Sequence, residues 1–187
     1  KTEKIENKTV RTALLTFTKE EISNLTKLGD VLFIDGTNVP NKLNWLCYPI
    51  TLVDERLSLQ CGGVLFVSRT TSDIFKWFFE SLFQLMQRLN IMDNIETIIS
   101  DEDLSFMKAI DDLNLQRDKK ILNVICFWHK MKNLEKKMTE LHISPDIKEK
   151  IKSLFYRIAK CPKKEIVIQS IEQMKSYSEE LNQIQFE

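Results

Sequence analysis

The stretch VLFIDGTNVPNKLNWLCYPITLVDE, residues 31–55, decides the fold, because it holds two strand-like runs and a carboxylate at the end of the first. Four apolar residues precede Asp35, so a charged group follows a segment typical of a buried strand. An unpaired charge left in such a place is costly. Asp35 therefore either belongs to a turn, helped by the adjacent Gly36, or holds something positively charged such as a metal ion.

The segments on either side of this stretch predict an α/β fold. Strands are expected at residues 31–35, 46–53, 59–67, 96–100 and 121–127, and helices at 18–28, 72–90, 103–113 and 128–141. An acidic DER turn makes a hairpin of the second and third strands, and the later alternation of strands and helices implies parallel crossovers. Three antiparallel and two parallel strands are thus predicted in one mixed sheet, while residues 1–17 are weakly patterned.

Cap residues mark where several of these helices begin. Thr18 and Glu21 have the spacing of a capping box, and Gly29 stops the helix that follows. Ser72 is expected to cap the long helix, and Asp103 fits the cap of the next one.

Charge and cysteine content narrow the class of protein. The 27 basic and 27 acidic side chains cancel, so composition gives no general reason to expect nucleic acid, although one face can still be basic. The cysteines lie far apart without a CxxC pair, which favours a reducing, intracellular setting over a disulfide framework. No apolar run approaches the roughly 20 residues that span a bilayer, so a soluble protein without a membrane partner is expected.

A second carboxylate, Asp101, follows the fourth predicted strand in TIISDEDLSFMKAI. The element order matches the ribonuclease H-like fold, in which strand four pairs parallel with strand one, so Asp35 and Asp101 should emerge as neighbours. Two carboxylates forced together repel each other unless a cation lies between them, and Mg²⁺ or Mn²⁺ prefers such oxygen ligands. The alternative is ordinary turn chemistry at Asp35 and simple helix capping at Asp103.

A third element, ICFWHKMKNL, places Cys126, Trp128 and His129 at the end of strand five and the start of the next helix. Cys126 and His129 supply two zinc ligands at most, and His142 and Cys161 would complete a site only by coincidence. The plainer alternative is a buried cysteine beside a hydrogen-bonded histidine.

Taken in order, the D-x-T first strand, the [ST]-D-x-[DE] fourth strand and the C-x-W-H fifth resemble the transposase domain of Mutator-like elements, the MULE domain, over roughly residues 28–142. The resemblance implies an RNase H-like core of the DDE transposase superfamily that uses Mg²⁺ or Mn²⁺ to cut DNA at transposon ends and join it to a target. Asp35 and Asp101 would be the catalytic metal ligands, with Cys126, Trp128 and His129 near the site. It further implies a nuclear setting and a homo-oligomer in the full-length form.

Beyond His142 the pattern is wholly helical, with Ser144 and Pro145 opening one helix and Pro162 leading into another. We expect residues 1–27 to form an N-terminal segment, 28–142 the core, and 143–187 a helical insertion cut short in a piece of a longer protein. In this family the third acid, a Glu, follows the insertion, and none of Glu179, Glu180 and Glu187 is assigned to that role. An alternative is a domesticated copy that binds DNA or regulates transcription without cleaving DNA, as in plant far-red-response transcription factors.

Local charge and aromatic residues bear on DNA binding. Residues 130–164 carry eleven basic side chains against four acidic ones, which indicates either a phosphate-binding surface or a solvated helix face with ion pairs around Glu135. Trp77, Phe78 and Phe79 have core spacing and are predicted to pack on the sheet. Trp128 is the better candidate for an aromatic residue near the site.

Overall fold

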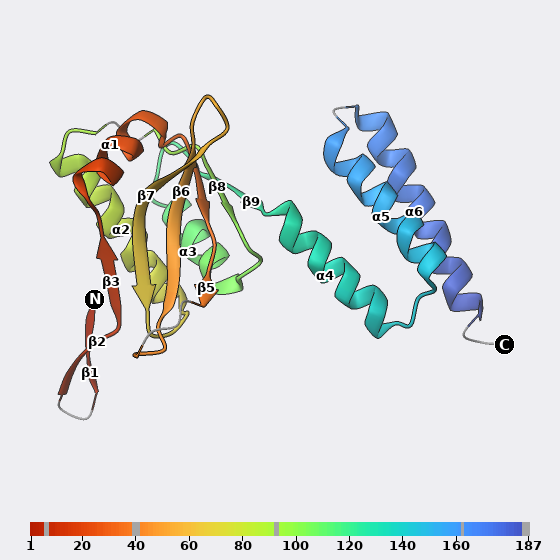
Figure 1. Cartoon of the computed structure of the whole chain (residues 1–187), viewed down its shortest axis with the longest axis horizontal. Coiled ribbons are helices and arrows are strands. Elements are labelled where there is room, and N and C mark those ends of the chain that lie inside the picture. Colours follow the sequence, from red (N-terminus) through yellow and green to blue (C-terminus); the bar gives the residue numbers. More distant parts are fainter. Residues whose placement is uncertain (6–7, 39–41, 92–93, 162, 185–187) are drawn as a thin grey trace. The chain divides into compact units, whose positions relative to one another are not determined.

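A computed structural model describes residues 1–5, 8–38, 42–91, 94–161 and 163–184 of the chain. Contacts between residues divide it into two units, Lys1–Cys126 and Phe127–Glu187, and each unit is described by itself (Figure 1). The functional division into residues 1–27, 28–142 and 143–187 remains a prediction.

The first unit is built on a mixed sheet that confirms the predicted fold class. Its main strands are β4 (Val31–Ile34), β6 (Leu46–Val53), β7 (Leu59–Val67), β8 (Thr97–Ser100) and β9 (Leu122–Ile125). With β3 (Ala13–Thr16) included, the strand order is β3-β7-β6-β4-β8-β9. β4, β6 and β7 pair antiparallel, whereas β8 pairs parallel with both β4 and β9. This is the RNase H-like arrangement of three antiparallel and two parallel strands expected from the sequence.

The N-terminal residues contain strands that the sequence pattern did not indicate. β3 (Ala13–Thr16) adds an edge strand to the sheet by pairing antiparallel with β7, while β1 (Thr2–Ile5) and β2 (Lys8–Arg11) form a separate hairpin. A two-residue strand, β5 (Thr37–Asn38), also pairs with β6 just beyond β4. β3 was missed because a four-residue strand at the edge of the sheet shows little hydrophobic alternation.

Over the described residues of this unit, the chain forms the helices α1 (Lys19–Leu28), α2 (Ser72–Arg88) and α3 (Leu104–Asn114). The predicted capping box is present, since the Glu21 amide donates to the Thr18 hydroxyl and the Glu21 carboxylate accepts from the Thr18 amide. The cap predicted for α2 was wrong by one residue. Thr71, not Ser72, is the N-cap, because its extended backbone lets its hydroxyl accept from the Ile74 amide.

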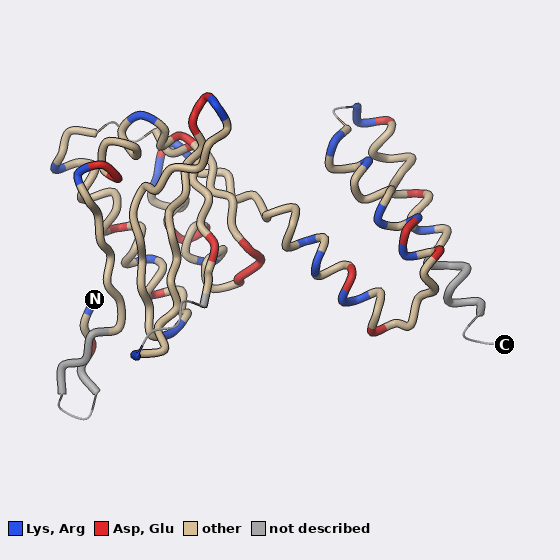
Figure 2. Tube along the Cα trace, viewed as in Figure 1, with Lys and Arg blue, Asp and Glu red and all other residues tan. Residues whose placement is uncertain are grey.

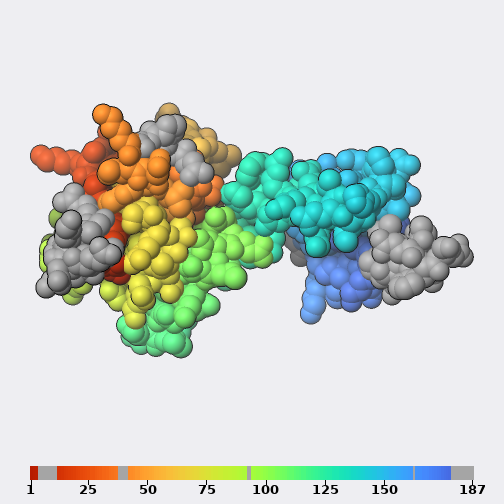
Figure 3. Space-filling model, turned by 90° about the horizontal axis from the view of Figure 1, so that it is seen from below, coloured from red at the N-terminus to blue at the C-terminus, as the bar shows by residue number. Residues whose placement is uncertain are grey.

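The core lies where α2 and α3 pack against each other and the sheet, and the two helices (yellow and green) lie side by side in Figure 3. Phe75 and Phe79 are fully buried, and each makes an edge-on ring contact with Phe106 of α3. Burying each such side chain contributes about 1.5–3 kcal/mol. Phe78 is also buried and Trp77 packs on the same cluster, so the predicted core role of these aromatics is confirmed.

The second unit consists of α4 (Phe127–Glu140), α5 (Pro145–Lys160) and α6 (Lys164–Ile184). The Phe127 ring stacks on Phe155 of α5 at 5.5 Å between centroids. Ser144 occupies the N-cap position of α5 with Pro145 at the first turn, as predicted, but its side chain makes no capping hydrogen bond. No helix in the described part of the chain is both long and apolar enough to cross a membrane.

Candidate metal and DNA site

The site forms where three adjacent strands, β4, β8 and β9, end in register at their carboxyl-terminal ends. This end of the sheet is called the carboxylate edge below. Ile34 of β4 pairs with Ser100 of β8, and Ser100 pairs with Ile125 of β9. The next residue on each strand is Asp35, Asp101 and Cys126, respectively. Because neighbouring strands lie about 4.8 Å apart, parallel pairing starts the two carboxylate side chains from adjacent backbone positions. The sequence predicted this neighbourhood for Asp35 and Asp101, and the observed register supports it.

Asp35 occupies the short connection between β4 and β5, and its side chain is exposed. The following residue, Gly36, packs against the phenol ring of Tyr48 on β6. A Cβ atom at position 36 would lie only 2.8 Å from the Cε1 and Cζ atoms of that ring. Glycine is therefore needed here because of this close approach.

Asp101 and Asp103 frame the start of α3. The Asp103 amide donates to Oδ1 of Asp101 at 3.3 Å, and Oδ1 of Asp103 accepts from the amides of Ser105 and Phe106 at 2.7 and 3.2 Å. Asp103 is thus the N-cap of α3, as the sequence allowed. The N-terminal end of the helix carries partial positive charge, which favours carboxylates at this position.

Tyr48 is the feature of this edge that the sequence analysis missed. Its side chain is only 4% exposed, and its ring meets Phe75 edge-on at 5.3 Å. Burial raises the pKa of Tyr48 above the ordinary tyrosine value, and the negative charges of Asp103, Asp101 and Asp35 raise it further. All three carboxylates therefore act on the pKa of one largely buried tyrosine. No local motif reveals this, because Tyr48 reaches Gly36 only through pairing of the strands.

The chemistry of these donors fits a hard divalent cation. Carboxylate oxygens are the ligands that Mg²⁺ and Mn²⁺ prefer, and a cation between Asp35 and Asp101 would relieve their mutual repulsion. One oxygen of Asp103 is already engaged in capping α3. Within the described ranges, no group of three or more His, Cys, Asp or Glu side chains is arranged to hold a metal ion. These described side chains do not make a complete coordination shell, and the choice of Asp35 and Asp101 as metal ligands remains a prediction.

The C-x-W-H element begins with Cys126, which directly follows β9. The Cys126 amide donates to the Ser100 carbonyl at 2.7 Å, which extends the pairing of β8 and β9 by one residue, and its thiol is half-buried. Trp128 and His129 lie in the first turn of α4, in the second unit, with their rings in edge-on contact at 4.8 Å. Trp128 is 59% exposed, and the Lys132 ammonium lies 5.6 Å from its ring centroid. A role for these residues at the site remains a prediction.

None of the three glutamates considered for the third acid has a described side chain. Glu179 and Glu180 lie in α6, in a stretch whose side chains are not described, and Glu187 lies outside the described residues. The third acid therefore stays unassigned.

The second unit carries mixed charge along its helices (Figure 2). Lys152 of α5 lies 3.1 Å from Glu135 of α4 and 3.1 Å from Glu149. Hydrogen bonding to Lys152 lowers the pKa of Glu135 below its usual value. Part of the basic surplus is thus paired within the unit, as the solvated-face alternative expected, and several other lysines, among them Lys136 and Lys150, are exposed.

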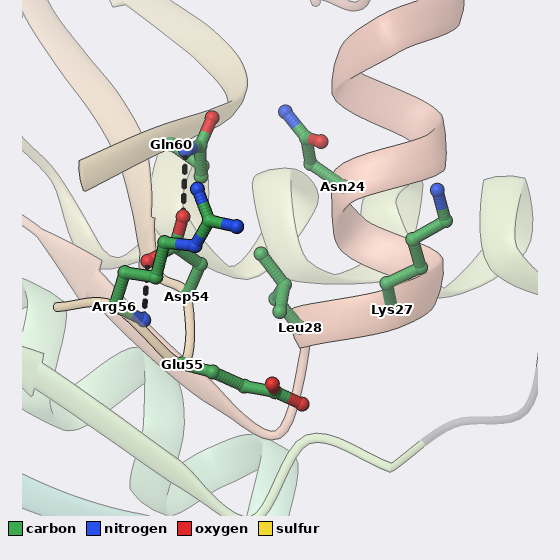
Figure 4. A pocket seen from close by; sticks show the side chains of 7 residues that line it. All are labelled: Asn24, Lys27, Leu28, Asp54, Glu55, Arg56 and Gln60. Atoms are coloured by element: carbon green, nitrogen blue, oxygen red, sulfur yellow. Dashed lines mark hydrogen bonds between the residues drawn. The ribbon is translucent and has the colours of Figure 1, made fainter. Parts of the chain in front are cut away.

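A separate cavity of about 500 Å³ lies beside the β6–β7 turn (Figure 4). Asp54 organises that turn by accepting hydrogen bonds from the amides of Arg56 and Ser58 and from the Gln60 side chain. The cavity is at the opposite end of β6 from Tyr48, so it is not part of the carboxylate edge. It is lined by Asn24, Lys27, Leu28, Asp54, Glu55, Arg56 and Gln60.

Comparison with known proteins agrees with this geometry. No curated protein matches the chain. The MULE transposase domain matches residues 31–133, more than half of the chain, and the match begins with β4 and ends inside α4. It thus contains both carboxylates and the whole C-x-W-H element. With its RNase H-like sheet and its two acids on paired strands, the chain belongs to the MULE transposase domain family.

Proposed function

We propose that this chain carries the catalytic core of a Mutator-like DDE transposase, which cuts DNA at transposon ends and joins it to a target. The observation that carries the proposal is the parallel register of β4 and β8, since it brings Asp35 and Asp101 to adjacent positions at one sheet edge. Membership of the family implies a transposase-related function, and the two acids supply the part of that function that requires a metal.

In this proposal Asp35 and Asp101 bind Mg²⁺ or Mn²⁺ through their carboxylate oxygens. A bound pair of such ions would activate a water or a 3′-hydroxyl and stabilise the leaving oxygen of a phosphodiester. The protein holds the acids in place through the β4–β8 pairing and through the hydrogen bond from the Asp103 amide to Asp101. Capping of α3 by Asp103 keeps that amide in position.

The partners that follow from the proposal are transposon-end DNA and target DNA, met in the nucleus by a homo-oligomer of the full-length protein. Exposed lysines on α4 and α5 support contact with phosphates, because such contacts come mainly from Lys and Arg side chains. Cys126, Trp128 and His129 are proposed to lie near the reacting DNA.

The test is nicking of supercoiled plasmid DNA in Mg²⁺ or Mn²⁺ by the full-length protein and by its Asp35→Asn and Asp101→Asn variants. Either substitution keeps the shape of the side chain but removes its charge, so nicking is expected to fall to background. Glu96→Gln is the matched control, because Glu96 immediately precedes β8 on an exposed site and pairs with Lys119. Undiminished nicking by both aspartate variants would refute the proposal.

A second candidate is a domesticated module that binds DNA without cleaving it. The observation that favours it is the basic surplus of residues 130–164, which needs no carboxylate to bind phosphate. This candidate predicts DNA binding that weakens steeply with salt and is unchanged in Asp35→Asn, together with no nicking by the unmodified protein.

A further inference from the structure

The hydroxyl group of Tyr48 lies against the backbone that carries the first acid. A Cβ atom at Gly36 would be 3.0 Å from the Tyr48 hydroxyl oxygen, and Gly36 directly follows Asp35. Tyr48 sits opposite Gly36 because β6 pairs with β4 on one side of this point and with β5 on the other. The position of the phenol is therefore set by the same strand pairing that positions Asp35.

The ring has little freedom to leave this position. It is 4% exposed, it meets Phe75 edge-on, and it lies so close to Gly36 that a Cβ atom there would be 2.8 Å from Cε1 and Cζ. A phenylalanine would make the same ring contacts, so packing against Phe75 and Gly36 does not account for the hydroxyl. The hydroxyl therefore calls for a role of its own.

The surroundings of the hydroxyl indicate what that role is. The hydroxyl oxygen lies beside Gly36, the residue that follows Asp35, and the negative charges of Asp103, Asp101 and Asp35 add to burial in raising the pKa of the phenol. A tyrosine hydroxyl carries its proton at neutral pH and can donate one hydrogen bond. The oxygen atoms that a metal at this edge would bring are a phosphate oxygen, which is an acceptor, and a bound water, whose remaining lone pair can accept one hydrogen bond.

We propose that Tyr48 is a positioning residue of the carboxylate site, whose hydroxyl donates a hydrogen bond to an oxygen ligand of the metal held by Asp35 and Asp101. This rests on the proposed function, because it requires a metal at that edge. The ligand oxygen belongs either to water or to a nucleotide phosphate, and the two sources are separated by the test.

The test compares Tyr48→Phe with the unmodified chain by calorimetry, first with Mn²⁺ alone and then with thymidine 5′-monophosphate added to the Mn²⁺-loaded protein. Tyr48→Phe keeps the ring packed against Phe75, and an unchanged melting temperature verifies the fold. Tyr156→Phe is the matched control, since this second tyrosine lies in the other unit and is 43% exposed.

Loss of one hydrogen bond to a charged group weakens binding by about 10- to 100-fold. A drop of that size in Mn²⁺ affinity supports a bond to metal-bound water, and a drop in nucleotide affinity alone supports a bond to phosphate. Gly36→Ala should reproduce the same loss by displacing the phenol. If Tyr48→Phe matches both the unmodified chain and Tyr156→Phe in the two titrations, Tyr48 is only a core residue and the inference is wrong.

Failure of this inference is distinguishable from failure of the proposed function. Retention of Mn²⁺ affinity in both Asp35→Asn and Asp101→Asn would show that these carboxylates do not form a metal site. The inference about Tyr48 would then also be wrong. Loss of Mn²⁺ in those variants, with no effect of Tyr48→Phe, would overturn the inference alone.

Discussion

Asp103 offers a stability test that separates its capping role from its charge. Its Oδ1 accepts from two amides at the start of α3, the helix that contributes Phe106 to the core. Removing an N-cap oxygen costs about 0.5–2 kcal/mol, and the charge at a helix N-terminus adds about 0.3–1 kcal/mol. Asp103→Asn keeps the capping oxygen and should cost only the charge contribution. Asp103→Ala loses both and should cost about 1–3 kcal/mol.

The assay is thermal and urea unfolding of the metal-free chain, followed by circular dichroism. For a protein of this size, 1 kcal/mol shifts the melting temperature by roughly 2–4 °C. Asp111→Ala, on the last turns of the same helix, is the control and should leave stability unchanged or raise it slightly, because an acid is unfavourable there. The reasoning fails if Asp103→Asn destabilises as much as Asp103→Ala, or if Asp103→Ala costs nothing.

Three further predictions concern the core, the second unit and the first helix. Phe75→Ala should cost about 3–5 kcal/mol in urea unfolding, because its fully buried ring contacts Tyr48 and Phe106, whereas Leu115→Ala, at an 83% exposed position, should be neutral. The pKa of Glu135 is lowered in the folded state. Its charged form therefore contributes to folding stability above about pH 4.3, the ordinary pKa of glutamate, and this contribution is lost as the pH falls through the lower pKa of the folded state. The stability difference between the unmodified chain and Glu135→Gln should therefore shrink in unfolding curves below about pH 4, and a constant difference would contradict this. Thr18→Ala should cost about 1 kcal/mol by removing the capping box, and no loss in unfolding experiments would count against it.

The sheet could be predicted where its strands are long or buried. Leu46–Val53 and Leu59–Val67 are long, largely apolar runs that flank an acidic turn, so their hairpin was evident from sequence. β3 was missed because its four residues are at the edge of the sheet, where Leu14 remains 38% exposed. Helix starts were predictable to within one residue, and choosing Thr71 over Ser72 requires the backbone conformation, because both carry a hydroxyl.

Only the part of the candidate site that follows from the order of strands and helices along the sequence could be predicted. Asp35 and Asp101 each follow an apolar run, and the order of elements was enough to predict that they become neighbours. Tyr48 was not predictable, because its place beside Gly36 depends on the register between β6 and β5. Local sequence contains no signal for a contact made across strands.

The most direct test of the central claim is calorimetric titration of this chain with Mn²⁺ at moderate salt, alongside Asp35→Asn and Asp101→Asn. If the two carboxylates form one metal site, the unmodified chain binds Mn²⁺ and either substitution abolishes or strongly weakens that binding. Asp103→Asn keeps the cap on α3, so its Mn²⁺ affinity should stay much closer to that of the unmodified chain than the affinity of the other two variants. Mn²⁺ binding that survives in both Asp35→Asn and Asp101→Asn would contradict the account.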